Sequence, residues 1–386
     1  MRRPGTNLEA AVKARYETAA QNPERELCCP TSYDPKYLAP IPAEILERDY
    51  GCGDPTGFVQ PGDTVLDLGS GAGKICYIAA QIAGPRGQVI GVDFNEEMLA
   101  LARKHRATVA RRLGYDNAVF HRARIQDLRL PLDAVESYLR KHAVRSIDDW
   151  ARFQAFVADR RSRSPLIPDE SVDVVLSNCV LNLVPDEDKP ALFAEMHRVL
   201  RRGGRAAISD IVADEDVPDE MKADPALWSG CISGAMREDR FLGGFERAGF
   251  YGIQIEKYDE KPWRTVRGIQ FRSITITARK GKEGPCLERL QAVIYKGPWK
   301  EVRDDDGHVL RRGERVAVCD KTFTILTRAP YAPDIVGVRP LREVPIRKAR
   351  PFACKGLALR DPRETKGRRY QATSLPGNGA CGPGCC

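Results

Sequence analysis

The residues best suited to chemistry begin with a glycine-rich turn. Gly69, Gly71 and Gly73 stand in the segment LDLGSGAGK, between a pattern that predicts a strand and one that predicts a helix. Glycine lets the backbone approach a ligand closely, and the first turn of a helix offers unpaired N–H groups. The spacing is not that of a dinucleotide-binding turn, because Lys74 stands where the third glycine of that motif would be. With Asp67 before it, the turn suits a cofactor that has an amino-acid head instead of a pyrophosphate.

A second carboxylate, Asp93, ends the next predicted strand. In nucleoside-binding folds, an acidic residue about 20 residues beyond the glycine turn accepts hydrogen bonds from the ribose hydroxyls. Asp93 and the glycine turn together therefore predict a cofactor that contains a nucleoside. The alternative is a tight strand–helix turn that binds no ligand.

Cysteine offers a second kind of chemistry. The chain has 12 cysteines among 386 residues, too few for a disulfide scaffold, and reduced thiols can act as soft ligands or redox groups. Cys52 stands in YGCGDP before the first predicted strand, Cys179 in SNCVLNLVPD after the fourth, and Cys231 in LWSGCISGA after the fifth. These three are candidate ligands of a soft ion, or else small residues of the core.

The elements that must position these residues alternate between strand and helix. Strands in short alternation with helices predict an α/β fold with a doubly wound, mostly parallel sheet. Strand patterns occur at 64–69, 88–93, about 118–121, 171–178 and 205–212, and helical patterns at 8–21, about 41–49, from about 74, 95–112, 190–201 and 239–249. The segments 251–258 and 268–278 are expected to add an antiparallel hairpin that closes the sheet.

The composition and the pattern of predicted elements change along the chain, which suggests a division into segments and domains. A polar, Arg-rich helical insertion is expected at about 130–168, and the turn DDDG at 304–307 is expected to separate two strands. We expect a helical N-terminal segment at 1–50, the sheet domain at 51–282, a small C-terminal β-containing domain at 283–330, and a tail rich in Pro, Arg, Gly and Cys at 331–386. The composition of the tail predicts that it is largely disordered.

Composition and charge exclude several classes of protein. With 42% hydrophobic and 30% charged residues, the chain reads as soluble and globular, and no apolar run approaches the roughly 20 residues of a membrane span. The net charge of +8 is only mildly basic for this length, and 7% of the residues are aromatic. Nucleic-acid binders usually gather basic and aromatic residues on one face, so we expect no nucleic-acid partner. The basic N-terminus lacks the apolar stretch of a signal peptide. We therefore expect a cytoplasmic protein that binds no membrane.

The glycine turn, Asp67 and Asp93 together resemble class I S-adenosylmethionine-dependent methyltransferases. The resemblance implies that S-adenosyl-L-methionine is the cofactor and that it lies across the carboxyl ends of the strands, at the point where the strand order reverses. By the same resemblance, Ile125 and Gln126 flank the adenine, and Asn178 lines the methionine end of the cofactor.

The cysteine segments narrow the resemblance to arsenite methyltransferases, from about residue 26 to residue 328. It includes a C-terminal stretch, AVIYKG…RRGERVAVCDKTFTIL. The family implies that Cys52, Cys179 and Cys231 bind trivalent arsenic as a thiol adduct, with Cys179 and Cys231 as the main pair. It also implies a thiol reductant such as glutathione or thioredoxin. Arsenic carries no proton and attacks the sulfonium methyl group with its lone pair, so positioning rather than a general base is expected to drive catalysis. The five histidines are scattered and are interpreted as surface residues.

The sequence departs from the family in the glycine turn. Many members carry a cysteine there that pairs with the cysteine of the YGCG segment, and in this chain that position is Ser70. Cys76, six residues on, is a candidate replacement. Alternatives remain for the whole chain as well: a methyltransferase for another small or soft acceptor, or a metalloid-binding protein without catalysis.

The remaining cysteines receive less specific interpretations. Cys286 and Cys319 are interpreted as structural. Three interpretations remain for a further group of cysteines: they relay the metalloid, they exchange disulfides, or they are exposed without a role. These are Cys28, Cys29, Cys381, Cys385 and Cys386.

Overall fold

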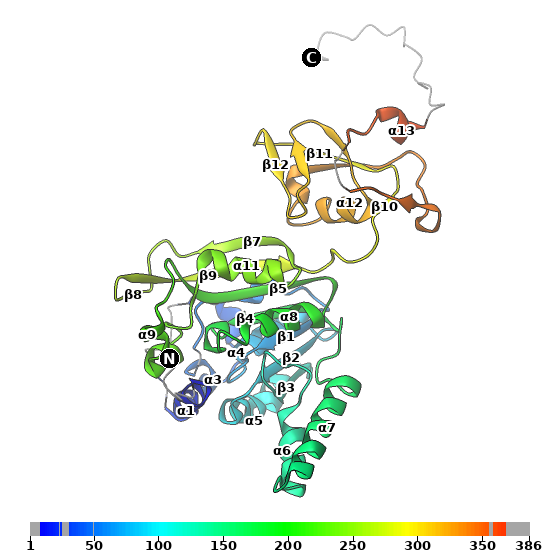
Figure 1. Ribbon diagram of the computed structural model, residues 1–386. Helices are drawn as coiled ribbons and strands as arrows, with labels where there is room; N and C mark the ends of the chain where they lie inside the picture. The colour runs from blue at the N-terminus through cyan, green and yellow to red at the C-terminus, as the bar shows by residue number, and fades with distance from the viewer. Residues whose placement is uncertain (1–7, 23, 25–30, 49, 355–357, 368–386) are drawn as a thin grey trace, which may run out of the picture. The chain divides into compact units, whose positions relative to one another are not determined.

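The computed structural model of the chain divides into two units, Met1–Gly281 and Lys282–Cys386 (Figure 1). The structure describes residues 8–22, 24, 31–48, 50–354 and 358–367. The predictions for the cysteine pair at residues 28 and 29 and for the terminal cysteines therefore lie outside the described residues. No helix in the described part of the chain is long and apolar enough to cross a membrane.

A twisted central sheet organises the first unit, with the strand order β3-β2-β1-β4-β5-β9-β7. Strands β3, β2, β1, β4 and β5 run parallel to one another, and β9 is antiparallel to both β5 and β7. Short β6 pairs with β5, and β8 pairs with β9. The bounds are β1 (Thr64–Leu68), β2 (Gln88–Asp93), β3 (Ala118–Arg122), β4 (Val172–Asn178), β5 (Leu200–Ala213), β6 (Met236–Arg237), β7 (Tyr251–Tyr258), β8 (Arg264–Val266) and β9 (Ile269–Arg279). The doubly wound, mostly parallel sheet and its closing hairpin are confirmed.

Helices cover both faces of this sheet, which explains why its strands are almost continuously apolar. Alternate residues of one strand enter different cores: Val65 packs with α4 (Lys74–Ala83) and α5 (Glu96–Leu113), whereas Leu66 packs with α8 (Lys189–Val199) and α11 (Glu238–Arg247). The strand order reverses between β1 and β4, so their carboxyl ends frame an open crevice.

The predicted insertion is a pair of helices, α6 (Leu132–Lys141) and α7 (Ile147–Arg163), between β3 and β4 (Figure 1). The rings of Tyr138 and Phe156 stack at 4.3 Å between centroids and join the two helices. The insertion therefore has a small aromatic contact of its own.

The helices and turns outside the sheet include two that join the N-terminal part of the chain to the segment after β5. In this group α1 packs against α10, and the Arg15 guanidinium donates hydrogen bonds to the Ala226 carbonyl (3.0 Å) and Ser229 Oγ (3.1 Å). The elements are α1 (Leu8–Gln21), α2 (Pro35–Leu38), α3 (Ala43–Leu46), η2 (Pro55–Phe58), η3 (Leu181–Leu183), α9 (Asp219–Lys222) and α10 (Pro225–Ser229).

The second unit is built from short antiparallel strands. Strands β14, β11 and β15 form one sheet, β12 pairs with β13 across the predicted DDDG turn, and β10 pairs with β16. The elements are β10 (Leu287–Glu288), β11 (Ala292–Tyr295), β12 (Glu301–Arg303), β13 (Val309–Arg311), β14 (Arg315–Ala317), α12 (Asp320–Leu326), η4 (Ala332–Asp334), β15 (Ile335–Val338), η5 (Ile346–Lys348), β16 (Arg350–Pro351) and α13 (Pro362–Lys366).

Two expectations for this unit are corrected. The predicted boundary at residue 330 cuts through the domain, because β15 supplies an edge of its sheet and Arg360, 6% exposed, forms an ion pair with Glu288 at 2.8 Å. The composition of this Pro- and Arg-rich stretch predicted a tail, but the apolar residues of β15 and the side chain of Arg360 have partners earlier in the chain. His308 is not a surface residue either: it is 7% exposed, and its Nδ1 lies 2.8 Å from Asp304 Oδ2.

Candidate active site

A cavity lies at the carboxyl ends of β1, β2 and β4, where the strand order reverses. It brings together most of the predicted cofactor residues with one of the three cysteines. Those that line it are Asp67, Gly69, Gly71, Asp93, Ile125, Gln126, Asn178 and Cys179. Gly73, Cys52 and Cys231 do not line it.

The glycine turn adopts the backbone conformation that its composition predicts. Gly69, Gly71 and Gly73 have φ angles of 72°, 51° and 90°, in the left-handed region that favours glycine. A Cβ added at Gly71 would meet nothing within 4 Å, so this face of the turn is open. A Cβ at Gly73 would lie 3.0 Å from the Phe120 ring, so Gly73 serves the packing of the strand and helix.

Asp93 is tied to the glycine turn itself. Its Oδ2 accepts a hydrogen bond from the Gly71 N–H (2.9 Å), and its Oδ1 accepts one from the Asn95 N–H (2.8 Å). Burial raises the pKa of Asp93 above its usual range, although these N–H donors oppose the rise. The carboxylate keeps acceptor capacity for a ligand.

The other cavity residues fit a nucleoside cofactor. Ser70 is buried, and its Oγ has no hydrogen-bond partner among the described residues, so a donor or acceptor of a ligand can complete it. Ile125 is 6% exposed and offers an apolar surface, and Gln126 Nε2 donates to Asp188 Oδ2 at 3.3 Å. The residues present therefore suit the cofactor that the sequence implies.

Asn178 lines the cavity, but the polar atoms of its side chain form hydrogen bonds with the protein. Its Oδ1 accepts hydrogen bonds from the N–H groups of Cys52 (2.9 Å) and Gly53 (3.1 Å). Its Nδ2 donates to the Gly53 carbonyl (2.7 Å) and the Tyr33 hydroxyl (3.2 Å). All four hydrogen-bonding positions of the amide are thus used. Asn178 holds the loop that carries Cys52.

The three predicted cysteines lie in one buried cluster. Cys52, Cys179 and Cys231 are 2%, 4% and 5% exposed, and they pack with Ile211 and Phe271. The Cys231 thiol donates to the Cys179 carbonyl at 3.3 Å. Cys179 and Cys231 have φ angles of 63° and 59°, a conformation that is uncommon for residues other than glycine and that gathers at functional sites.

The structure adds Asp210, which sequence reasoning missed. One carboxylate oxygen of Asp210 and the sulfurs of Cys52 and Cys179 lie within 4.8 Å of one another. Cys231 is outside this group of three, although it was expected to be the main partner of Cys179. The available signal was a lone acidic residue inside the apolar strand pattern RAAISDIV.

Asp210 is fully buried and anchors the turn that follows Cys179. Its carboxylate accepts hydrogen bonds from Leu181 N (2.9 Å), Asn182 Nδ2 (2.8 Å) and Ile211 N (2.8 Å). Burial raises the pKa of Asp210 to about 7, against the effect of these donors.

Cys76 lies on α4 and faces the sheet. Its thiol donates to Asp67 Oδ2 at 3.2 Å, and burial, with the charge of Asp67, raises the pKa of this thiol well above its usual range. A Cβ added at Gly91 would lie 2.8 Å from Cys76 Sγ and 2.9 Å from Ser70 Cβ. The Cys76 thiol and the Ser70 side chain therefore approach the same point of β2.

The fold, the glycine turn and the cavity define a class I S-adenosylmethionine-dependent methyltransferase, and S-adenosylmethionine is its cofactor. The family model described as a methyltransferase domain matches residues 60–249, and a domain of unknown function matches residues 282–370. The second match extends beyond residue 330, in agreement with the corrected boundary.

The chain belongs to the arsenite methyltransferase family. It is 30% identical to the arsenite methyltransferase of Aquipseudomonas alcaligenes, over 84% of this chain and 89% of that protein. It is 36% identical to that of Halobacterium salinarum, over 68% of this chain and 57% of the relative. A crystal structure of an arsenic(III) S-adenosylmethionine methyltransferase from Chlamydomonas reinhardtii has 26% identity and a TM-score of 0.54, covering 84% of this chain and 99% of that one.

Proposed function

We propose that Cys52, Cys179 and Cys231 hold the trivalent arsenic that this chain methylates with S-adenosylmethionine. The position of Cys179 carries the proposal. This residue lines the cavity of the glycine turn and also packs with the other two cysteines in one buried cluster. The cofactor cavity and the thiol cluster therefore meet at Cys179.

The donor set suits the substrate. Thiolates are soft ligands and select soft ions. When a thiol replaces a hydroxide on arsenous acid, an As–S bond forms, and the thiol proton leaves with the hydroxide as water. No electron is transferred in this exchange, so the chain needs only to present the thiols in a fixed arrangement.

Two polar residues, half-buried Asn178 and fully buried Asp210, fix that arrangement. Asn178 holds the backbone N–H of Cys52. Asp210 holds Leu181 and the Asn182 side chain, directly after Cys179. Their partners are buried, so the loss of either side chain leaves donors without water to replace it. We assign Asn178 and Asp210 as positioning residues.

The glycine turn binds the methyl donor. S-adenosylmethionine supplies an electrophilic sulfonium methyl group when it is bound. Asp93 offers its remaining lone pairs to the ribose hydroxyls, Gly71 gives the open backbone face, and Ser70 Oγ is available for a hydrogen bond. Ile125 contributes an apolar side of the cavity.

Reduced thiols are the expected partners of the reaction. Attack by the arsenic lone pair takes arsenic from the trivalent to the pentavalent state, so another round requires two electrons. Two thiols supply them as they form a disulfide, and we propose glutathione or thioredoxin as the source. The cytoplasm, where such thiols stay reduced, is the proposed location.

Incubation with labelled S-adenosylmethionine, arsenite and glutathione tests the proposal. Methylated arsenic should form with the wild-type chain, and Cys179→Ser and Cys231→Ser should lose it while calorimetry shows that both still bind the cofactor. Full activity in both variants would contradict the assignment of the thiols. Arsenite binding without transfer of label would indicate a metalloid-binding protein without catalysis.

A further inference from the structure

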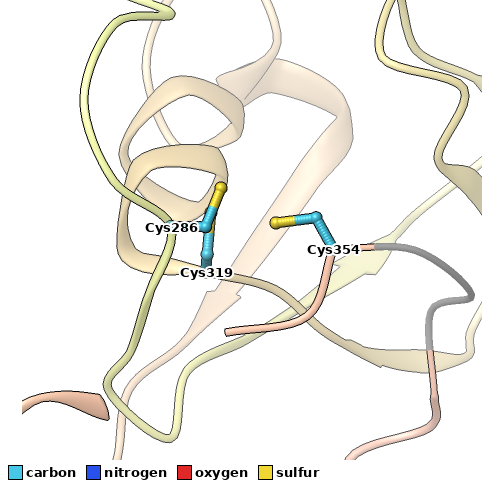
Figure 2. A group of neighbouring side chains, drawn as sticks. All are labelled: Cys286, Cys319 and Cys354. Atoms are coloured by element: carbon cyan, nitrogen blue, oxygen red, sulfur yellow. The ribbon is translucent and has the colours of Figure 1, made fainter. Parts of the chain in front are cut away.

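The second unit contains a group of thiols that belongs to no part of the methyltransferase site. Cys286 precedes β10, Cys319 stands directly before α12, and Cys354 follows β16. Their sulfurs all lie within 4.8 Å of one another. Figure 2 shows the Cys354 side chain reaching across from its own segment toward Cys286 and Cys319.

Core packing does not account for this convergence. The apolar cluster of the unit is formed by residues such as Val293, Val316 and Phe323, and it includes none of the three cysteines. Cys319 is buried, but Cys286 and Cys354 are partly exposed. Two thiols that reach solvent beside a third buried one leave a path for an ion to enter.

The surroundings favour the thiolate form of Cys286. Cys319 Sγ accepts a hydrogen bond from the Thr322 N–H at 3.4 Å, and its distance to Thr322 Oγ1 is 3.2 Å. A hydrogen bond from the Cys354 thiol lowers the pKa of Cys286, and the Lys321 ammonium lowers it further. Burial and the same bond raise the pKa of Cys354 to about 12, so Cys286 is the first of the two to ionise.

The number of donors distinguishes among soft ions. Within the described residues, no histidine, carboxylate or further cysteine joins the three sulfurs. A structural zinc ion takes four ligands in a tetrahedron. Trivalent arsenic bonds three thiolates as a pyramid and keeps a lone pair at its apex, so three sulfurs complete it.

We propose that Cys286, Cys319 and Cys354 form a three-thiolate binding site for trivalent arsenic in the second unit. The choice of arsenic among soft ions rests on the proposed function of the chain. Arsenous acid would exchange its three hydroxides for the three thiols: three As–S bonds form, three As–O bonds break, and the three thiol protons leave with the hydroxides as three waters. Arsenic and sulfur keep their oxidation states.

The test uses the full chain with Cys179→Ser and Cys231→Ser, so that the proposed arsenic site of the first unit keeps only Cys52 of its three thiols. The reduced protein is loaded with arsenite without cofactor and gel-filtered, and arsenic per chain is measured together with X-ray absorption at the arsenic edge. We expect one arsenic with three As–S bonds. Further substitution with Cys286→Ser or Cys354→Ser should remove that arsenic.

A matched control replaces Cys381, Cys385 and Cys386 with serine and should leave the bound arsenic unchanged. Peptide mapping of the wild-type chain supplies a readout that needs no substitution in the second unit. Arsenite should protect Cys286 and Cys354 from alkylation by N-ethylmaleimide.

Several results would overturn the site. They are retention of arsenic in Cys286→Ser and Cys354→Ser, loss of arsenic in the terminal-cysteine control, alkylation unaffected by arsenite, or a four-coordinate zinc ion in the purified chain. Failure of the proposed function is a separate outcome, because it appears as absent methylation by the wild-type chain whatever the second unit binds.

Discussion

Replacement of Asn178 by alanine should separate arsenite methylation from cofactor binding. The change removes the acceptor of the buried Cys52 and Gly53 N–H groups and the donor to Tyr33. A buried N–H left without a partner costs about 1–3 kcal/mol, so two of them should lower the free energy of unfolding by about 3 kcal/mol after partial relaxation. The corresponding fall in Tm for a unit of this size is roughly 6–12 °C.

The expected loss of activity follows from the position of Cys52. Displacement of a reacting group by about 1 Å can reduce a rate about 100-fold, so arsenite methylation by Asn178→Ala should fall roughly 10- to 100-fold. The affinity for S-adenosylmethionine should stay close to that of the wild-type chain, because the polar atoms of Asn178 contact the protein. Turnover with arsenite measures the loss of activity, and calorimetry measures the affinity for the cofactor. The alkylation rate of Cys52 reports whether this thiol has moved.

Asn117→Ala is the matched control. Asn117 Nδ2 donates to the carbonyls of Ala80 (3.1 Å) and Gly84 (2.9 Å), and Asn117 precedes β3, at the amino ends of the strands. This variant should lose stability but keep the alkylation rate of Cys52. If Asn178→Ala instead loses cofactor affinity in parallel with turnover while Cys52 reacts as in the wild type, Asn178 acts on the cofactor and our reasoning is wrong.

Four more substitutions test the rest of the site. Asp93→Ala should weaken S-adenosylmethionine binding roughly 10- to 100-fold, since a charged hydrogen bond contributes about 1.5–3 kcal/mol; unchanged affinity in calorimetry would refute our placement of the ribose. Cys52→Ser should retain methylation of a monomethylated trivalent arsenical, which needs two protein thiols, and lose methylation of arsenite. Cys76→Ser should keep arsenite activity, and a loss parallel to that of Cys52→Ser would mean that Cys76 has replaced the loop cysteine. The pKa of Asp210 rises to about 7 on folding, so its contribution to stability is present below about pH 4 and is lost as pH rises through 7. Asp210→Asn should therefore flatten the pH dependence of the free energy of urea unfolding by up to about 4 kcal/mol. Parallel pH profiles for the wild-type chain and the variant would contradict this.

Patterns among residues close together in the sequence were sufficient to predict the central sheet and the glycine turn. Apolar strand patterns in alternation with helices predicted the parallel sheet, and the glycines at 69 and 71 predicted a ligand-binding turn between a strand and a helix. Both properties depend on residues within a few positions of each other. The resemblance of three short cysteine segments then pointed to soft-ligand chemistry.

The pairings inside the site required the tertiary structure. Asn178 and Cys52 are 126 residues apart in the chain, and Asp210 meets the two sulfurs only because β5 lies beside β4 in one register. The sulfurs at 286, 319 and 354 converge from three separate segments, and β15 joins a sheet from a stretch whose composition predicted disorder. Composition and periodicity describe neighbours along the chain, whereas these contacts are set by strand register and by packing between distant segments.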